Sequence, residues 1–146
     1  MLNLSAQAQC SGPLPETVGH PWSYFERRGC VLDCRGPLVI DRTSRWGFGV
    51  RVITRSHATD AWPVLGHTID RGVTVERCAW IGSYSVLTGC RIGRFAIVAA
   101  GTVVRGQDVA PGVMVAGNPA RVIARWDGAQ WVYEPAEVSG FGRVLA

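Results

Sequence analysis

Large aliphatic side chains recur in this sequence at every sixth residue, and this repeat constrains the fold more than any other feature. The recurring positions are Ile69, Val75, Ile81, Val86, Ile92, Val98 and Val104. Successive members are six residues apart, except for one step of five between Ile81 and Val86. The same phase is present upstream, at Ile40, Trp46 and Val52.

A period of six fits neither the 3.6 residues of a helical turn nor the two-residue alternation of a long strand. A short strand followed by a tight turn does explain it. In most hexads a smaller side chain, such as Ala79 or Ala96, lies two residues before the aliphatic one. Residues with this spacing point to the same side of a strand. Glycine often comes next, as at Gly82, and we expect it to adopt turn conformations that other residues resist.

Repetition of this unit winds the chain into stacked, flat-sided coils whose aliphatic residues fill a narrow core. The sequence therefore predicts an all-β fold, a single-stranded parallel β-helix of hexapeptide repeats. The alternative is an ordinary β-meander with coincidental spacing, and the number of matching steps argues against it.

Two breaks in the repeat predict the organisation of the chain. The phase is lost between His57 and Ile69, so residues 58–68 are expected to form a loop extruded from the coil. The repeat ends near Gly106, and the later segments 122–126 and 130–133 are expected to form a hairpin around Asp127-Gly128. This hairpin would cap the open end of the coil. The predicted units are an irregular N-terminal segment 1–28, the β-helix domain 29–117 and the C-terminal cap 118–146.

Composition narrows the classes of protein further. The chain is 47% hydrophobic and 18% charged, which argues against disorder, and its 18 glycines follow no collagen period. The net charge of +4 is carried by arginine, which suits an anionic ligand but is too modest to indicate nucleic acid. We expect no membrane span, no signal peptide and a cytoplasmic protein. The five cysteines lack zinc-ligand spacing, so we expect reduced thiols and no metal.

Residues 79–122 resemble the hexapeptide-repeat acetyltransferases, closest to the sugar O-acetyltransferases of the galactoside, maltose and colanic-acid type. The matching words are AWIG, AAGTVV and AGNPARV. The resemblance implies a left-handed β-helix, an exception to the right-handed crossover rule. It also implies homotrimers that bind acetyl-CoA in a groove between subunits. Ala99 replaces the first glycine of the family's GAG word, and one residue is missing between WIG and LTG; the acceptor is not implied by these words.

Acyl transfer needs a base that removes the proton of the attacking hydroxyl or amine. His57 ends the hexad VITRSH, at the place of the catalytic histidine in the family's words of the form T-x-x-H-[DN], although Ala58 follows it here. The resemblance therefore implies His57 as the general base; the alternative is a loop histidine bonded to nearby backbone. For His67 a contact with the acceptor stays open, and His20 is expected to be structural.

The same resemblance implies residues that contact the cofactor. Ser83 and Ala100 match positions that contact the pantetheine arm, and the alternative for both is turn and core packing. Trp80 is expected either to line the cofactor groove or to lie at the subunit interface. Guanidinium groups suit phosphates, so the expected CoA phosphate contacts are Arg105, Arg121 and Arg125, which are otherwise solvated. Asn118-Pro119 is expected to be a cis bond in a tight turn.

The activity implied is transfer of acetyl from acetyl-CoA to a hydroxyl of a sugar or glycan. Three alternatives stay open: an N-acetyltransferase acting on an amino sugar, a non-catalytic β-helix scaffold, and a γ-type carbonic anhydrase. The last needs three histidines on zinc, and only His57 and His67 lie near the repeats.

Overall fold

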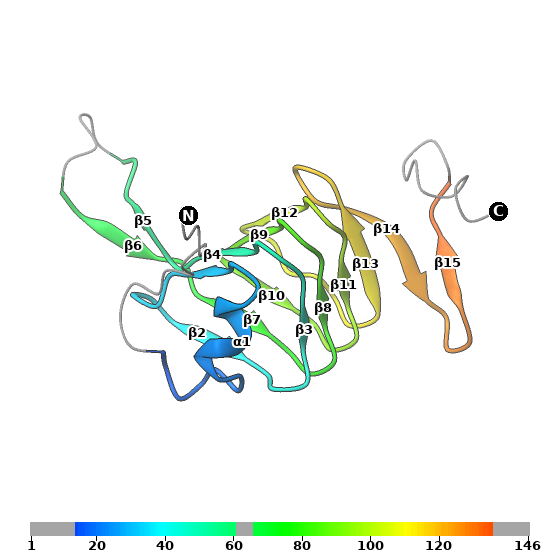
Figure 1. The fold of residues 1–146 in the computed structure, drawn as a ribbon. Helices are drawn as coiled ribbons and strands as arrows, with labels where there is room; N and C mark the ends of the chain where they lie inside the picture. Colours follow the sequence, from blue (N-terminus) through cyan, green and yellow to red (C-terminus); the bar gives the residue numbers. More distant parts are fainter. Residues whose placement is uncertain (1–13, 61–65, 136–146) are drawn as a thin grey trace, which may run out of the picture.

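The computed structural model describes residues 14–60 and 66–135, and its strands wind into stacked three-sided coils (Figure 1). Three sheets form the sides. Face A contains β1 (Val31–Leu32), β4 (Arg51–Ile53), β9 (Val86–Thr88) and β12 (Val103–Arg105). Face B contains β2 (Leu38–Ile40), β7 (Val73–Val75) and β10 (Cys90–Ile92). Face C contains β3 (Arg45–Trp46), β8 (Trp80–Ile81), β11 (Ile97–Val98), β13 (Val113–Ala116), β14 (Arg121–Trp126) and β15 (Trp131–Tyr133).

Strands of successive coils pair in parallel, and the register gives the length of a coil. Val75 pairs with Ile92 on face B, and Ile81 pairs with Val98 on face C, an offset of 17 residues in both cases. On face A, Leu87 pairs with Val104 with the same offset. Each of these coils is thus one residue shorter than three hexads, so one step in every coil is five residues long.

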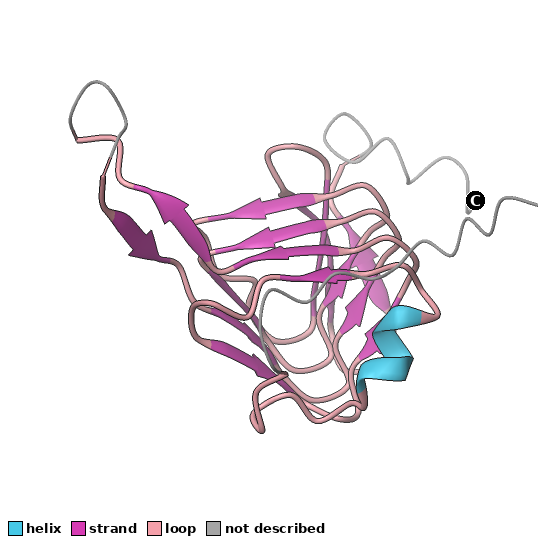
Figure 2. Cartoon of the chain, turned by 60° about the vertical axis from the view of Figure 1, so that its left-hand side comes forward, coloured by secondary structure: helices cyan, strands magenta, loops and turns pink. Residues whose placement is uncertain are grey.

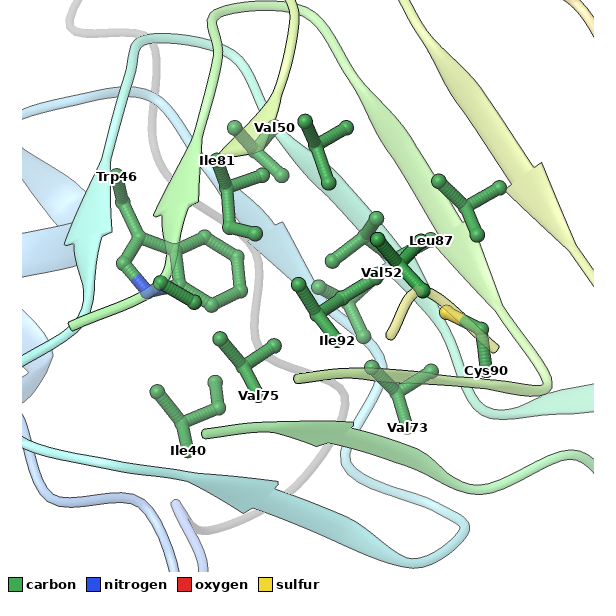
Figure 3. Packing of buried hydrophobic residues seen from close by; sticks show 14 of the residues in the cluster. Ile40, Trp46, Val50, Val52, Val73, Val75, Ile81, Leu87, Cys90 and Ile92 are labelled. Carbon is green, nitrogen blue, oxygen red and sulfur yellow. The ribbon is translucent and has the colours of Figure 1, made fainter. Parts of the chain in front are cut away.

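The core confirms the predicted repeat and corrects two of its members. Ile81, Ile92 and Val98 are fully buried, and the labelled side chains in Figure 3 converge on one narrow interior. Leu87, with no exposed surface, occupies the inward position predicted for Val86, which is only partly buried. The five-residue step therefore follows Leu87 rather than Ile81. Ile69 is 37% exposed because its strand lies outside the coil.

Glycines after the inward residues are required by close packing, and their predicted turn role was wrong. A Cβ atom on Gly47, Gly82 or Gly93 would lie 2.5 Å from a backbone nitrogen of the next coil. Left-handed backbone occurs two residues later, where φ is 60° at Tyr84 and 59° at Phe95. The sharp corner of a coil is thus built partly by aromatic residues in a conformation that side chains usually avoid.

A short helix, α1 (Trp22–Glu26), lies within the N-terminal segment that was expected to be irregular. Phe25 is fully buried, and its ring meets Trp46 of the first coil edge-on at 5.3 Å. His20 stacks on Tyr24 at 4.1 Å. This aromatic cluster packs against the core side chains of the first coil. The five-residue helix is too short to cross a membrane, and the described residues contain no other helix.

The chain leaves the coil as an antiparallel hairpin, which begins before and ends after the expected loop 58–68. Its strands are β5 (Arg55–His57) and β6 (Thr68–Asp70), which pair only with each other. The hairpin projects from one end of the coil (Figures 1 and 2). The C-terminal hairpin is also confirmed: β14 and β15 pair antiparallel around Gly128 (φ 109°), and β14 pairs antiparallel with β13.

Candidate active site

His57 ends the first strand of the projecting hairpin. It is exposed, and its backbone is opposite Thr68 in the antiparallel register. The N–H of Ala58 donates to the carbonyl of His67 at 3.0 Å, which keeps the two arms together beyond the strands. Within residues 14–60 and 66–135, no hydrogen bond to the His57 ring occurs. The imidazole is thus accessible rather than used to hold a loop.

The other two histidines have different surroundings. His67 is on the returning arm, with its side chain 75% exposed and Nε2 3.7 Å from Asp60 Oδ1. His20 is buried, and its Nε2 lies 3.1 Å from the carbonyl oxygen of Ser44. Burial lowers the pKa of His20. Its ring therefore serves packing at the first coil, as the sequence suggested.

Ser83 and Ala100 occupy equivalent positions at the corner between faces C and A. The Phe48 N–H donates to Ser83 Oγ at 3.0 Å, and the Gly101 N–H donates to the Ser83 carbonyl at 2.8 Å. Ser83 thus joins the coil before it to the coil after it. Ala100 is exposed one coil further on. The corner presents backbone groups and small side chains in a column, with the exposed ring of Phe48 at one end.

Trp80 points outward from face C and is 54% exposed. It lines a hollow of about 760 Å³ whose other main walls are Phe95, Ile97, Trp126 and Trp131. Trp126 and Trp131 meet edge-on at 5.7 Å, across the C-terminal hairpin. Sequence reasoning selected Trp80 alone. The other aromatic residues come from a different coil or from the hairpin, and only the three-dimensional fold brings them together.

Two of the three arginines expected at the CoA phosphates line one hollow. Arg121 and Arg125 line a hollow of about 340 Å³ near the C-terminal end of the coil, with Gln107 and Asp108. Arg125 Nε lies 3.5 Å from Glu134 Oε1. Arg105 ends β12 on face A and does not line this hollow. The peptide bond Asn118-Pro119 nearby is cis, as predicted.

Two cysteine thiols are buried in the core and are not exposed to react with a ligand. Cys30 and Cys90 are buried, and burial raises the pKa of both, that of Cys90 to about 12. Among residues 14–60 and 66–135, no group of three His, Cys, Asp or Glu side chains is placed to hold a metal ion.

The predicted base and the predicted cofactor contacts are on different elements of the fold. His57 is on the hairpin β5–β6, whereas Trp80 is on β8 of face C and Ser83 follows it. Figure 1 shows the hairpin projecting from one end of the coil and away from β8.

Comparisons with known proteins place this architecture in a class. No protein-family model matches the sequence. A stretch of 52 residues, 35% of this chain, is 52% identical to a 2,3,4,5-tetrahydropyridine-2,6-dicarboxylate N-acetyltransferase of Staphylococcus aureus, of which it covers 21%. The structure superimposes on a maltose O-acetyltransferase from Clostridium difficile with a TM-score of 0.63 and 27% identity, over 68% of this chain and 54% of that one.

The fold is the left-handed parallel β-helix of the hexapeptide-repeat acetyltransferases. The resemblance inferred from AWIG, AAGTVV and AGNPARV is thereby confirmed. The chain spans about a fifth of the length of the curated relatives that it matches, and about half of the maltose O-acetyltransferase.

Proposed function

We propose that this protein is an acetyl-CoA-dependent acetyltransferase that moves an acetyl group to a hydroxyl of a sugar or glycan. The observation that carries the proposal is the structural match with the maltose O-acetyltransferase, which extends over 68% of the chain. The exposed histidine at the end of β5 would supply the general base that this chemistry requires.

In the proposed reaction, neutral His57 accepts the proton of the acceptor hydroxyl as its oxygen attacks the thioester carbonyl. The tetrahedral intermediate carries negative charge on the former carbonyl oxygen, and a backbone N–H at the cofactor groove stabilises it. When the intermediate collapses, the C–S bond breaks and the CoA thiolate takes the proton from the imidazolium. Acetylated acceptor and free CoA leave, and no metal is needed.

The proposed donor site follows the corner of faces C and A, where Ser83 and Ala100 offer backbone groups to the pantetheine arm. Trp80 borders this site from face C. Arg121 and Arg125 are our proposed contacts for the CoA phosphates, because their guanidinium groups share one hollow and suit phosphate geometry. Arg105, at the end of β12, is proposed as a third contact to the CoA phosphates.

We propose that the enzyme works as a homotrimer, with each site between two protomers. Apolar side chains on the outer sides of two faces support this: Val31, Val86 and Val103 on face A, and Trp80, Ile97 and Met114 on face C. Burial of such surfaces between protomers would stabilise the assembly. The same assembly would bring the hairpin of one protomer to the cofactor groove of the next.

An N-acetyltransferase acting on an amino sugar is a second candidate. It is favoured by the 52-residue match, because the relative concerned is named as an N-acetyltransferase. The same base and groove serve an amine, which must be neutral to attack.

The test is release of the CoA thiol from acetyl-CoA in the presence of a panel of sugars and amino sugars. We expect release with a hydroxyl acceptor, and a loss of kcat on the order of 100-fold or more for His57→Ala. His67→Ala is the matched control, because His67 is exposed on the other arm of the same hairpin; it should keep kcat at saturating acceptor. Unchanged turnover in His57→Ala would exclude this base, and failure to bind acetyl-CoA would favour the scaffold.

A further inference from the structure

The two arms of the hairpin meet the coil at one buried residue. Thr54 lies between β4 and β5 and has no exposed surface. Its carbonyl accepts the N–H of Arg71, the residue that follows β6, at 2.6 Å. The outgoing and returning arms are therefore joined at Thr54, and any rotation at this residue turns the whole hairpin.

A loop from the first coil holds Thr54 in place. Thr54 Oγ1 donates to the carbonyl of Asp33 at 2.7 Å and accepts the N–H of Gly36 at 2.9 Å. Gly36 approaches so closely that a Cβ atom there would lie 2.5 Å from the Thr54 carbonyl oxygen. Residues 33–36 thus enclose the side chain and backbone of Thr54.

The carboxylate of Asp33 fixes the backbone at the exit itself. Its Oδ2 accepts the N–H groups of Thr54 at 3.2 Å and Arg55 at 3.1 Å. Its Oδ1 accepts the N–H and Nε of Arg35 at 3.2 and 2.7 Å, and Arg35 Nη2 lies 3.1 Å from Oδ2. Asp33 is 8% exposed, and its hydrogen bond with Arg35 raises the pKa of that guanidinium. Both carboxylate oxygens accept hydrogen bonds from donors. The side chain at this position therefore has to provide two acceptor oxygens and a negative charge.

From this geometry we infer that Asp33 is a positioning residue that sets the direction of the hairpin and thereby the place of His57. The inference rests on the proposed function of His57 as the base. Arg55, whose amide Asp33 holds, is two residues before His57 on the same strand. Displacement of a reacting group by about 1 Å can cost about 100-fold in rate, so a carboxylate at the root can control the chemistry at the tip.

Asp33→Asn is the test variant. Its amide group replaces one acceptor oxygen by a donor, which opposes either the Thr54 and Arg55 amides or Arg35. Asp41→Asn is the matched control. Asp41 accepts the N–H and hydroxyl of Thr43 within a turn of the coil, and the hairpin does not leave the coil at this turn. Both variants are assayed as the full chain, by kcat and KM for acetyl-CoA and by amide hydrogen exchange.

We expect Asp33→Asn to lower kcat by about 10- to 100-fold with KM for acetyl-CoA unchanged, and Asp41→Asn to keep kcat. Exchange at the Arg55 and Arg71 amides should become at least tenfold faster in Asp33→Asn, while the Trp80 and Gly82 amides of face C keep their rates. Wild-type kcat in Asp33→Asn, or equal acceleration at Trp80, would overturn the inference. If the wild-type chain transfers no acetyl group, the proposed function fails instead, and unchanged exchange at Arg55 and Arg71 would reject the anchor independently.

Discussion

The coil and the projecting hairpin are both built from short strands but owe their structure to different contacts. In the coil, β7 buries its first and last residues, and each strand pairs with neighbours in adjacent coils. In the hairpin, all three residues of β6 and two of the three in β5 are exposed, and the strands pair only with each other. The coil is stabilised by a shared hydrophobic core, and the hairpin is held where its two arms join the coil.

This difference separates the tasks of the two regions. Stacked coils form a rigid support because every layer is buried by the next. An isolated two-stranded hairpin is marginally stable in water, so the orientation of β5–β6 has to come from Thr54 and Asp33 or from a neighbouring protomer. The hairpin can therefore carry an exposed reactive side chain at a distance from the packed core.

The largest expected effect compares an isoleucine of each region. Ile81→Ala removes fully buried side-chain atoms and should lower the free energy of unfolding by about 2–5 kcal/mol. Ile69→Ala, at a position 37% exposed on the hairpin, should change it by no more than about 0.5 kcal/mol. Urea denaturation at one protein concentration, followed by tryptophan fluorescence, measures both. An equal cost at Ile69 would break the comparison and show that the hairpin is covered in the assembly.

A second pair of variants tests the backbone. Gly82→Ala places a Cβ atom 2.5 Å from the Ala100 nitrogen, and such overpacking should cost about 1–3 kcal/mol of unfolding free energy. Gly66→Ala meets nothing within 4 Å on the hairpin, and should be neutral or stabilise by up to about 1 kcal/mol. Thermal melting of the two variants beside the wild type gives the comparison. A stable Gly82→Ala would mean that the coils can separate at this corner.

Sequence reasoning succeeded in the coil because one local rule is repeated there. Each hexad places a small and a large side chain on the same side, so the inward set could be predicted without distant contacts. The rule failed where it could not choose between neighbours: Val86 and Leu87 are both aliphatic, and only the pairing of Leu87 with Val104 shows which one points inward. Ile69 kept the six-residue phase with Val75 by coincidence, since Ile69 is on the returning arm of the hairpin, outside the coil.

The candidate site was predictable only in part, for a related reason. His57 could be located because the loss of phase marks the point where the chain leaves the coil. The hollow at Trp80 could not, because Phe95 and Trp131 reach it from other coils and from the C-terminal hairpin. Asp33 carried no local signal either: the backbone that it holds is 21 and 22 residues away. Which residues of adjacent coils contact each other depends on the register of the paired strands. The sequence of a single hexad does not specify that register.

A smaller decrease in stability is expected when the pH is lowered, and it should originate where His20 packs against the first coil. Burial lowers the pKa of His20 below its ordinary value of 6.5, so the folded chain binds fewer protons than the unfolded chain below that pH. Stability is therefore full above about pH 6.5 and falls as the pH drops below it, until folded His20 also takes up a proton. The free energy of unfolding at about pH 7.5 and 5.5 measures the fall.

His20→Gln should remove most of this fall, and His67→Gln on the hairpin should leave it in place. The carboxylates whose pKa is lowered by hydrogen bonds, such as Asp41 and Glu76, start from ordinary values of 3.8 and 4.5 and act at lower pH. A fall that persists in His20→Gln would mean that another group controls the pH response.

The smallest effect is expected from the ion pair that joins the arms of the hairpin. Arg55 Nε lies 2.6 Å from Asp70 Oδ1, and this hydrogen bond lowers the pKa of Asp70 and raises that of Arg55. Both side chains are substantially exposed, at 32% and 46%, so water and salt weaken the attraction. A double-mutant cycle of Arg55→Gln and Asp70→Asn should give a small coupling that decreases with added salt. A large coupling that persists at high salt would mean that the pair becomes buried when the protomers assemble, and the orientation of the hairpin would then depend on the neighbouring protomer rather than on the contacts at Thr54.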